Sequence, residues 1–478
     1  MKINKNTKNT GPAPEKLAGG MGATAARINA LKELQRSVLA CFLWEDIAYE
    51  GGETVATRIA RLVPNVAPEE VAALAFNARS TGKLRHVPLL LVREMARHPK
   101  HKAYVAFALE QVIQRPDELS EFVSIYWKNK KEPLSAQVKK GLARAFTKFD
   151  EYQLAKYSGE GKDVSLRDVL FLCHAKPQDK KQAALWKRLV NNTLKTPDTW
   201  EVALSESKGE NKKEVWERLL SEGKLGAMAL LRNLRNFETQ GVDRKLVTQA
   251  LKSCKTDRVL PFRFITAVKY APRYQTELEA TMLRAVNGVK TLKGKTVVLV
   301  DVSGSMDSGL SGKSEMSRIE CASSLCILLR ELCEDVVFYA TAGYDGSCVH
   351  KADLVRPHRG FALRDEIIKK KNELGGGGIF LKQAMDYALA KESEADRVIV
   401  ITDEQDTDKK ANPDTANAWG KKNYIINISV EKGGVAYKKF HHINGFSESV
   451  IDYIAASEQL DSAGDYNSLI KSFGFNNQ

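Results

Sequence analysis

The chain changes its sequence pattern at Gly294. The next residues, Lys295-Thr296-Val297-Val298-Leu299-Val300, form a continuous apolar run rich in β-branched side chains. Such a run is typical of a strand that is buried on both faces of a parallel sheet. Helices expected at 316–333, 361–374, 379–392 and 447–458 alternate after it with strands expected at 335–340, 348–355, 397–402 and 424–430. This alternation predicts a doubly wound α/β domain over residues 292–462.

Residues 21–291 have a different pattern, in which one helix follows another across short polar loops. No fixed sequence period is present, so the pattern predicts an α-solenoid or an irregular helical array. Asp117, Ser135, Ser165 and Asp198 stand where helix N-caps are expected. Residues 1–20 and 463–478 are expected to be tails. Apolar residues recur at three- and four-residue spacing over 25–43, 67–79, 86–97, 116–128, 133–149, 163–174, 179–192, 226–238, 243–253 and 275–288.

Charge is distributed unequally between these two parts. Residues 1–290 hold 50 Lys and Arg against 32 Asp and Glu, a net charge of +18, whereas residues 291–478 hold 23 against 27, a net charge of −4. This asymmetry favours a helical part that faces a polyanion, with a basic surface that only confers solubility as the alternative. The chain has no run of about 18 apolar residues and no apolar leader at its start, so we expect a cytoplasmic protein without membrane contact.

Three oxygen-bearing side chains follow the first predicted strand directly. Alternation along Asp301-Val302-Ser303-Gly304-Ser305 points Asp301, Ser303 and Ser305 to one side of the loop. Ligand sites of open α/β sheets form outside the carboxyl ends of the strands, and Asp403 ends a later predicted strand. One or two carboxylates with two hydroxyls suit Mg²⁺ or another divalent cation. The alternative is a turn capped by Asp and Ser.

The motif DVSGSM, a glycine-rich loop before a helix, and VIVITDEQD resemble the metal-ion-dependent adhesion site of von Willebrand factor A domains. The resemblance implies that Asp301, Ser303 and Ser305 are metal ligands, that Asp403 acts through water, and that a partner's carboxylate completes the site. The family usually has a Thr at the end of a Gly-Gly-Thr loop, and Gly378 stands there in this chain. Metal binding is therefore expected to be weakened or lost.

Basic residues gather in the middle of the helical part. Lys140, Arg144 and Lys148 recur at four-residue spacing and predict one ridge on helix 133–149, opposite an apolar stripe. Most such ridges are only solvated faces, but Lys156, Lys162, Arg167 and Lys176 lie nearby along the chain. Lysines and arginines that neutralise phosphates release counterions, which makes nucleic-acid affinity fall with salt. His174 is expected from its position to interact with a helix end.

The segments LRDVLFLCHAKP, GAMALLRNLRNF and LPFRFITAVKYAPRY resemble the TROVE module of the Ro autoantigen family. Their order, followed by an A-type domain, matches the layout of that family over about residues 20–460. The resemblance implies a ring of HEAT-like helical repeats that the A domain closes. It also implies binding of small non-coding Y RNAs on an outer basic surface, with single-stranded 3′ ends of misfolded RNAs entering the ring.

The same resemblance carries two residues over to an RNA-binding role. His174 matches an RNA-contacting histidine in an H-x-K-P segment, and Lys156 precedes the Tyr of a matching K-Y pair. Lys162 lies in a loop that is shorter here than in animal relatives, and the remaining basic residues rest on charge and placement. The family further implies an exoribonuclease or another RNA-processing protein as a partner.

Three functions are compatible with these patterns. The favoured one is a Ro-like RNA-binding protein of bacterial or phage type, without catalytic residues. A metal-dependent protein-interaction adaptor, with the helical array as a scaffold, would lose its partner on treatment with EDTA or after Asp301→Ala. An enzyme that processes RNA with the metal would cleave labelled RNA in Mg²⁺.

Overall fold

The computed structural model describes most of the chain between residues 30 and 458. The described residues divide into two compact units, one helical and one built around a sheet. The described ranges are 30–39, 55–80, 82, 84–128, 130–157, 163–207, 211–256, 259, 261–286, 292–310, 316–374, 376–403, 406–407, 420–428, 439–444, 450–451, 454–455 and 458.

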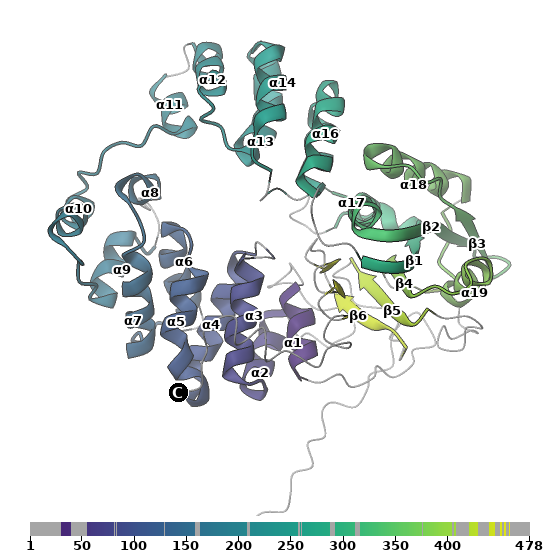
Figure 1. Ribbon diagram of the computed structural model, residues 1–478, viewed down its shortest axis with the longest axis horizontal. Coiled ribbons are helices and arrows are strands. Elements are labelled where there is room, and N and C mark those ends of the chain that lie inside the picture. Colours follow the sequence, from purple (N-terminus) through teal and green to yellow (C-terminus); the bar gives the residue numbers. More distant parts are fainter. Residues whose placement is uncertain are drawn as a thin grey trace, which may run out of the picture. The chain divides into compact units, whose positions relative to one another are not determined.

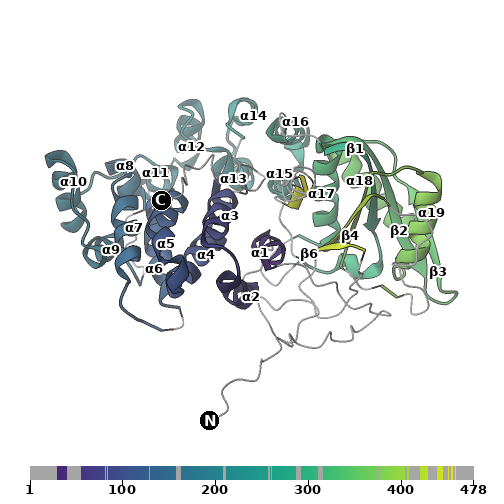
Figure 2. The same cartoon turned by 60° about the horizontal axis from the view of Figure 1, so that its bottom comes forward.

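The helical unit is a series of short helices that pack on their neighbours along the chain (Figures 1 and 2). Each of α3 to α7 packs on the next helix or on the one after it, and α11 to α15 repeat this pattern. Local packing of this kind is the hallmark of helical-repeat arrays, as predicted. The helices are α1 (Ala30–Leu39), α2 (Val55–Leu62), α3 (Pro68–Ser80), α4 (His86–Arg97), α5 (Lys102–Val112), α6 (Pro116–Tyr126), α7 (Ala136–Phe146), α8 (Glu151–Lys156), α9 (Leu166–Cys173), α10 (Lys180–Val190), α11 (Trp200–Glu206), α12 (Lys212–Ser221), α13 (Ala227–Thr239), α14 (Arg244–Ser253), α15 (Pro261–Tyr270) and α16 (Gln275–Val286).

Two of the four predicted N-caps are confirmed. The hydroxyl of Ser135 accepts a hydrogen bond from Val138 N and begins α7, and Ser165 forms a capping box that begins α9. The predictions for Asp117 and Asp198 are wrong. Pro116 already occupies the first turn of α6, which places Asp117 inside the helix, and Thr199 rather than Asp198 caps α11.

Helix α7 packs closely on α5 because Gly141 has no side chain. A Cβ atom at this position would lie 2.8 Å from the Cβ of Leu109 and 2.9 Å from the carbonyl oxygen of Ala106. The predicted apolar stripe of α7 forms the rest of this contact, since Val138, Leu142 and Phe146 are fully buried. Burial of this stripe leaves the opposite side of α7 in solvent.

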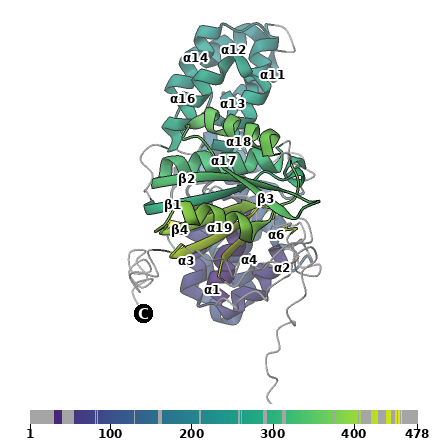
Figure 3. The same cartoon turned by 90° about the vertical axis from the view of Figure 1, so that its right-hand side faces the viewer.

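The sheet unit contains a six-stranded sheet in the order β3-β2-β1-β4-β5-β6. All neighbouring strands are parallel except β2 and β3. Helices α17 and α18 cover one face and α19 covers the other (Figure 3). This arrangement confirms the predicted doubly wound α/β fold. The elements are β1 (Leu292–Asp301), α17 (Arg318–Leu332), β2 (Cys333–Tyr344), β3 (Val349–Leu354), α18 (Gly360–Leu374), α19 (Leu381–Lys391), β4 (Arg397–Thr402), β5 (Lys422–Asn427) and β6 (His441–Asn444).

Several features differ from the sequence prediction or lie beyond it. Strand β6 was not predicted, and most of the predicted helix 447–458 lies outside the described residues. Cys321, Cys326 and Cys333 are buried free thiols. Within the described ranges, no helix is long and apolar enough to cross a membrane.

Candidate functional site

The described residues among those predicted to bind RNA lie on α7, α8 and α9 or shortly after the ends of these helices. Seven of the eight are described, and each of the seven is exposed, whereas Lys162 lies outside the described residues. Helix α9 packs on α7 and α6, so two of the three helices are direct neighbours. The exposed residues are Lys140, Arg144, Lys148, Lys156, Arg167, His174 and Lys176.

The three cations that were predicted to form one ridge on α7 make different contacts in the structure. Helix α7 ends at Phe146, so Lys148 lies beyond it. The ammonium group of Lys148 donates hydrogen bonds to the carbonyl oxygens of Glu110 and Ile113, at the end of α5. Burial of this ammonium group lowers the pKa of Lys148, although the residue as a whole is exposed. Arg144 lies 3.6 Å from Glu110 at the surface.

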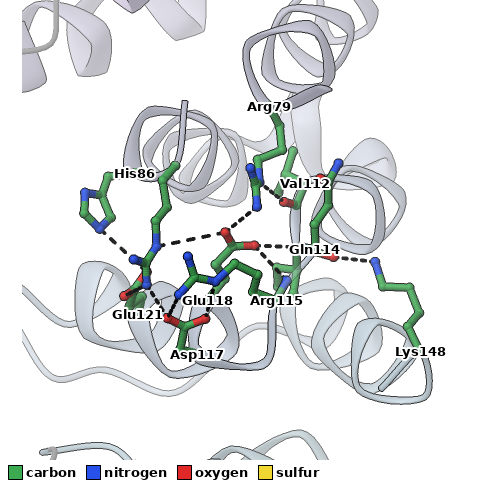
Figure 4. A network of polar contacts seen from close by, with 11 residues as sticks. Arg79, His86, Val112, Gln114, Arg115, Asp117, Glu118, Glu121 and Lys148 are labelled. Carbon is green, nitrogen blue, oxygen red and sulfur yellow. Dashed lines mark hydrogen bonds and ion pairs between the residues drawn. The ribbon is translucent and has the colours of Figure 1, made fainter. Parts of the chain in front are cut away.

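Lys148 is therefore a residue that joins two helices as well as a surface cation. Figure 4 shows it beside a polar network whose central member is Glu118. The fully buried Glu118 carboxylate pairs with Arg79 at 2.5 Å and accepts hydrogen bonds from Gln114 N at 2.7 Å and Arg115 N at 3.1 Å. Burial raises the pKa of Glu118, and the Arg79 guanidinium opposes this shift. The network fixes the turn between α5 and α6.

We expect Lys148→Met to lower the free energy of unfolding by about 1–2 kcal/mol, because two carbonyl groups at the end of α5 lose a charged donor. Methionine keeps the apolar stem of the side chain. Urea unfolding of the full chain measures the change, with Lys140→Met as the matched control that leaves stability nearly unchanged. Equal stabilities of the two variants would contradict the structural role of Lys148.

Helix α9 presents an exposed aromatic ring between two predicted RNA-binding residues. Arg167, Phe171 and His174 follow at spacings of four and three, which places them on one side of the helix. Phe171 is 55% exposed, an unusual position for a large apolar ring. His174 ends the helix in the left-handed conformation with φ of 51°, so the predicted helix-end position is confirmed. Base stacking on aromatic rings is a common mode of single-stranded RNA binding.

The predicted metal motif lies at the carboxyl end of β1, in the sheet unit. Asp301 is fully buried, Ser303 is buried, and Ser305 is partly exposed. The Asp301 carboxylate accepts hydrogen bonds from Ser303 N at 2.8 Å and from Thr402 Oγ1 at 2.6 Å. Burial and the charge of Asp403 raise the pKa of Asp301 to about 7. The strands thus bring together the four predicted ligand residues around two carboxylates that repel each other.

An arginine that the sequence analysis did not single out also lies at this motif. Arg318, the first residue of α17, donates to Asp403 Oδ2 at 2.7 Å, and its Nη1 lies 3.4 Å from the carbonyl oxygen of Ser305. The Arg318 side chain is 3% exposed and that of Asp403 is fully buried. A guanidinium therefore neutralises one of the two carboxylates. No local pattern marks this pair, because its members are 85 residues apart in the sequence.

The remaining donors fit a small divalent cation. The hydroxyl oxygens of Ser303 and Ser305 are 3.1 Å apart. Neighbouring ligands of an octahedral Mg²⁺ ion are about 3 Å apart, given metal–oxygen distances of about 2.0–2.1 Å. Thr341 pairs with Asp301 across β1 and β2, and its buried hydroxyl makes no hydrogen bond within the described structure. Among the described residues, no group of three His, Cys, Asp or Glu side chains is arranged to hold a metal.

The structure gives a steric reason for glycine at position 378. A Cβ atom there would lie 2.5 Å from Thr407 Oγ1. The Thr407 hydroxyl in turn donates to the carbonyl oxygen of Ile379 at 2.7 Å. Thr407 therefore occupies the space into which a side chain of residue 378 would extend. The glycine-rich loop also lies close to the motif, because a Cβ atom at Gly304 would be 2.7 Å from the carbonyl oxygen of Gly376.

Restoring the threonine that A domains usually carry is expected to harm this chain. Gly378→Thr should lower the free energy of unfolding of the sheet unit by about 1–3 kcal/mol, because it overfills the space next to Thr407. Combining it with Thr407→Gly should recover most of this loss. Thermal unfolding of the single and double variants provides the comparison, and a single variant as stable as the wild type would show that the loop accommodates the extra atoms.

Comparison with models of protein families finds matches in both the helical and the sheet part of the chain. A model of the TROVE domain matches residues 187–352, and a model of the Ro60 vWA domain matches residues 295–424. Together the two matches make this chain similar to Ro proteins over residues 187–424. The sheet unit contains the region that matches the vWA domain. The TROVE match begins after Lys176, so the individual RNA-binding residues predicted on α7 to α9 stay predictions.

A solved structure has the same fold over most of this chain. The crystal structure of the Deinococcus radiodurans RO (RSR) protein aligns with a TM-score of 0.61 and 17% sequence identity, over 88% of this chain and 97% of that one. Telomerase protein component 1 of Mus musculus and that of Rattus norvegicus are each 41% identical over 93 residues, or 18% of this chain. The chain spans about 4% of the length of these curated relatives.

Proposed function

We propose that the helical unit holds small, structured, Y-like non-coding RNA together with single-stranded ends of misfolded RNA, for RNA quality control or processing in the cytoplasm. The observation that carries the proposal is the exposed set of cations on α7 to α9, with Phe171 between Arg167 and His174. The net charge of +18 over residues 1–290 supports it.

Each part of this surface has a distinct physical role in the proposal. Lys140, Arg144 and Arg167 contact phosphates, which gives affinity with little dependence on base sequence. The ring of Phe171 offers a face on which an unpaired base stacks, and every base has such a face. The surface would therefore select RNA by shape and by the presence of unpaired nucleotides.

Purification of the full chain from its native host, followed by sequencing of the bound nucleic acid, tests this function directly. We expect a defined small RNA to be enriched together with heterogeneous RNA fragments. A preparation free of RNA, or one with fragments in proportion to total cellular RNA, would contradict the proposal. Proteins that co-purify only before ribonuclease treatment would identify a partner recruited through RNA, such as an exoribonuclease.

We also propose that the motif in the vWA domain binds a divalent cation weakly. Asp301, Ser303 and Ser305 would hold it, with Asp403 in the outer sphere, and a bound cation would supply a vacant position for a partner's carboxylate. The separation of the two serine hydroxyls supports this proposal, and the Arg318–Asp403 pair accounts for weak binding. Within this chain, Arg318 supplies the charge that stabilises Asp403.

The Thr341 hydroxyl, which makes no hydrogen bond within the described structure, allows a test of this cation proposal. Replacing it should increase stability without metal but reduce the stabilisation that a metal provides. In EDTA, Thr341→Val should raise the free energy of unfolding by up to about 1 kcal/mol, because a buried hydroxyl without a hydrogen bond is replaced by a methyl group. Added Mn²⁺ should stabilise this variant less than it stabilises the wild type, because the variant has lost an oxygen near Asp301. Ser323→Ala, which removes a bonded buried hydroxyl elsewhere in the unit, serves as the control. Indistinguishable responses to Mn²⁺ in wild type and Asp301→Ala would contradict the proposal.

A further inference from the structure

Helices α11, α12 and α13 line a solvent-open cavity of about 450 Å³ in the helical unit. Small-molecule pockets typically have volumes of about 300–1,000 Å³, so this one is large enough for a nucleotide. The cavity is separate in the sequence from the cations on α7 to α9. Its lining includes two indole rings, two amide side chains, one ammonium group and one carboxylate, from Trp200, Trp216, Asn236, Gln240, Lys212 and Glu201.

The aromatic part of this cavity is held rigidly. Trp216 is 2% exposed and packs edge-on against Phe237, with ring centroids 5.0 Å apart. Trp200 stacks on Trp216 at 5.8 Å with an angle of 24° between the planes, and it is only half-buried. A ring supported from one side in this way is a preformed stacking platform, because little side-chain freedom is lost when a second ring lies on it.

The polar part is also oriented before any ligand arrives. The buried Asn233 side chain donates to the carbonyl oxygen of Ala229 at 2.9 Å and accepts from Asn236 Nδ2 at 2.8 Å. This chain of hydrogen bonds fixes the plane of the Asn236 amide. The amide keeps its carbonyl oxygen and one N–H for another partner, and Gln240 follows one helical turn later. Paired donors and acceptors of this kind match the edge of a nucleobase.

The ionic groups at the cavity indicate how the rest of a nucleotide would lie. Lys212 is the first residue of α12, where helix amides and the ammonium group both favour a phosphate. Glu201 is exposed and can accept a hydrogen bond from an exocyclic base amine, as acidic side chains do from cytosine. Stacking platform, oriented amide and phosphate-attracting end thus occur in one cavity.

We propose that this cavity binds one unpaired nucleotide of the RNA that the helical unit holds, with the base on Trp200 and its edge at Asn236 and Gln240. This inference rests on the proposed function, but it assigns a second contact region, on α11 to α13. An RNA bound on α7 to α9 would be anchored here by a single flipped-out base.

Binding of fluorescently labelled single-stranded RNA 12-mers to the full chain tests the proposal. Trp200→Ala should weaken binding about 5- to 150-fold, the range that corresponds to loss of one stacked base. Trp200→Phe should lose less, because a smaller ring keeps the stacking. The double variant Asn236→Ala and Gln240→Ala changes only exposed residues and guards against a folding defect in Trp200→Ala. Gln249→Ala, an exposed amide on α14, is the matched control.

Photocrosslinking with 4-thiouridine-substituted 12-mers locates the contact. We expect crosslinked peptides from residues 200–206, 212–221 or 227–240. Wild-type affinity in both the Trp200→Ala and the double amide variants, with crosslinks confined to α7 to α9, would overturn this inference and leave the proposed function standing. Tighter binding of free AMP, GMP, CMP or UMP than of the 12-mers would also overturn it, because the cavity would then serve a free nucleotide. No RNA binding by the wild type would refute the proposed function itself.

Discussion

Arg318→Met is expected to lower the free energy of unfolding of the sheet unit by about 3–5 kcal/mol. The Asp403 carboxylate is fully buried, and the Arg318 guanidinium at 2.7 Å neutralises it. Methionine fills much of the same volume but leaves the Asp403 charge beside the buried Asp301. Hydrogen exchange of the β1 and β4 amides measures the loss in the full chain, because it reports on the sheet unit separately from the helices.

A second variant and a cation separate the electrostatic effect from packing. Adding Asp403→Asn to Arg318→Met should recover most of the lost stability, because both members of the charge pair are then absent. Millimolar Mg²⁺ should stabilise Arg318→Met more than the wild type, because a divalent cation can take the place of the guanidinium charge. A loss below about 1 kcal/mol in the single variant would mean that the Asp403 charge reaches water.

Removing four cations from α7 to α9 is expected to weaken RNA binding on the order of 100-fold at low salt. The variant replaces Lys140, Arg144, Arg167 and Lys176 with glutamine and omits Lys148, whose ammonium group is bound to the end of α5. Each lost phosphate contact should reduce the slope of log affinity against log salt by about 0.7 for single-stranded RNA. The slope should therefore change by about 3 if all four cations contact phosphates.

A control of equal charge makes this experiment specific. Glutamine at Lys100, Lys245, Lys252 and Lys255 also removes four exposed cations, but from other parts of the same unit. Fluorescence anisotropy with labelled small RNA, at several salt concentrations, compares the two variants. If both lose affinity to the same extent, binding depends on the overall charge of the helical unit and the surface on α7 to α9 has no special role.

Much of the fold was predictable because it depends on local patterns. The run Lys295–Val300 indicated a central strand, and helix 86–97 was predicted with its observed bounds, since Pro99 follows it. Helices α11 and α12 lay outside the predicted segments because they are short and polar, and short helices gain stability mainly from their neighbours. Helix α5 was not predicted for another reason. Apolar residues occur on several sides of this helix, so its sequence has no clear amphipathic pattern.

The residues of the candidate sites were also predictable only where they form a local pattern in the sequence. Asp301, Ser303 and Ser305 are adjacent in the sequence, so the motif was visible before the structure. Arg318 and Asp403 meet only after folding, as do Trp200 and Trp216, and no spacing rule connects such pairs. Phe171 could have been found, because it falls on the Arg167 side of an otherwise apolar helix. The prediction for Lys148 failed in the opposite way. Its regular spacing from Lys140 and Arg144 predicted a place on the same helix, but α7 ends at Phe146.

Gly141 links the interior of the helical unit to its surface. A single added carbon at this position would meet Leu109 and the backbone of Ala106, and would force α7 away from α5. The contact of Arg144 with Glu110 joins the same two helices, and that of Lys148 with Ile113 lies just beyond their ends. A mutation at Gly141 would thus move several of the groups that we propose to contact phosphates, without itself touching RNA. Under the proposed function, RNA affinity would therefore limit the residues tolerated at this core position, in addition to thermal stability.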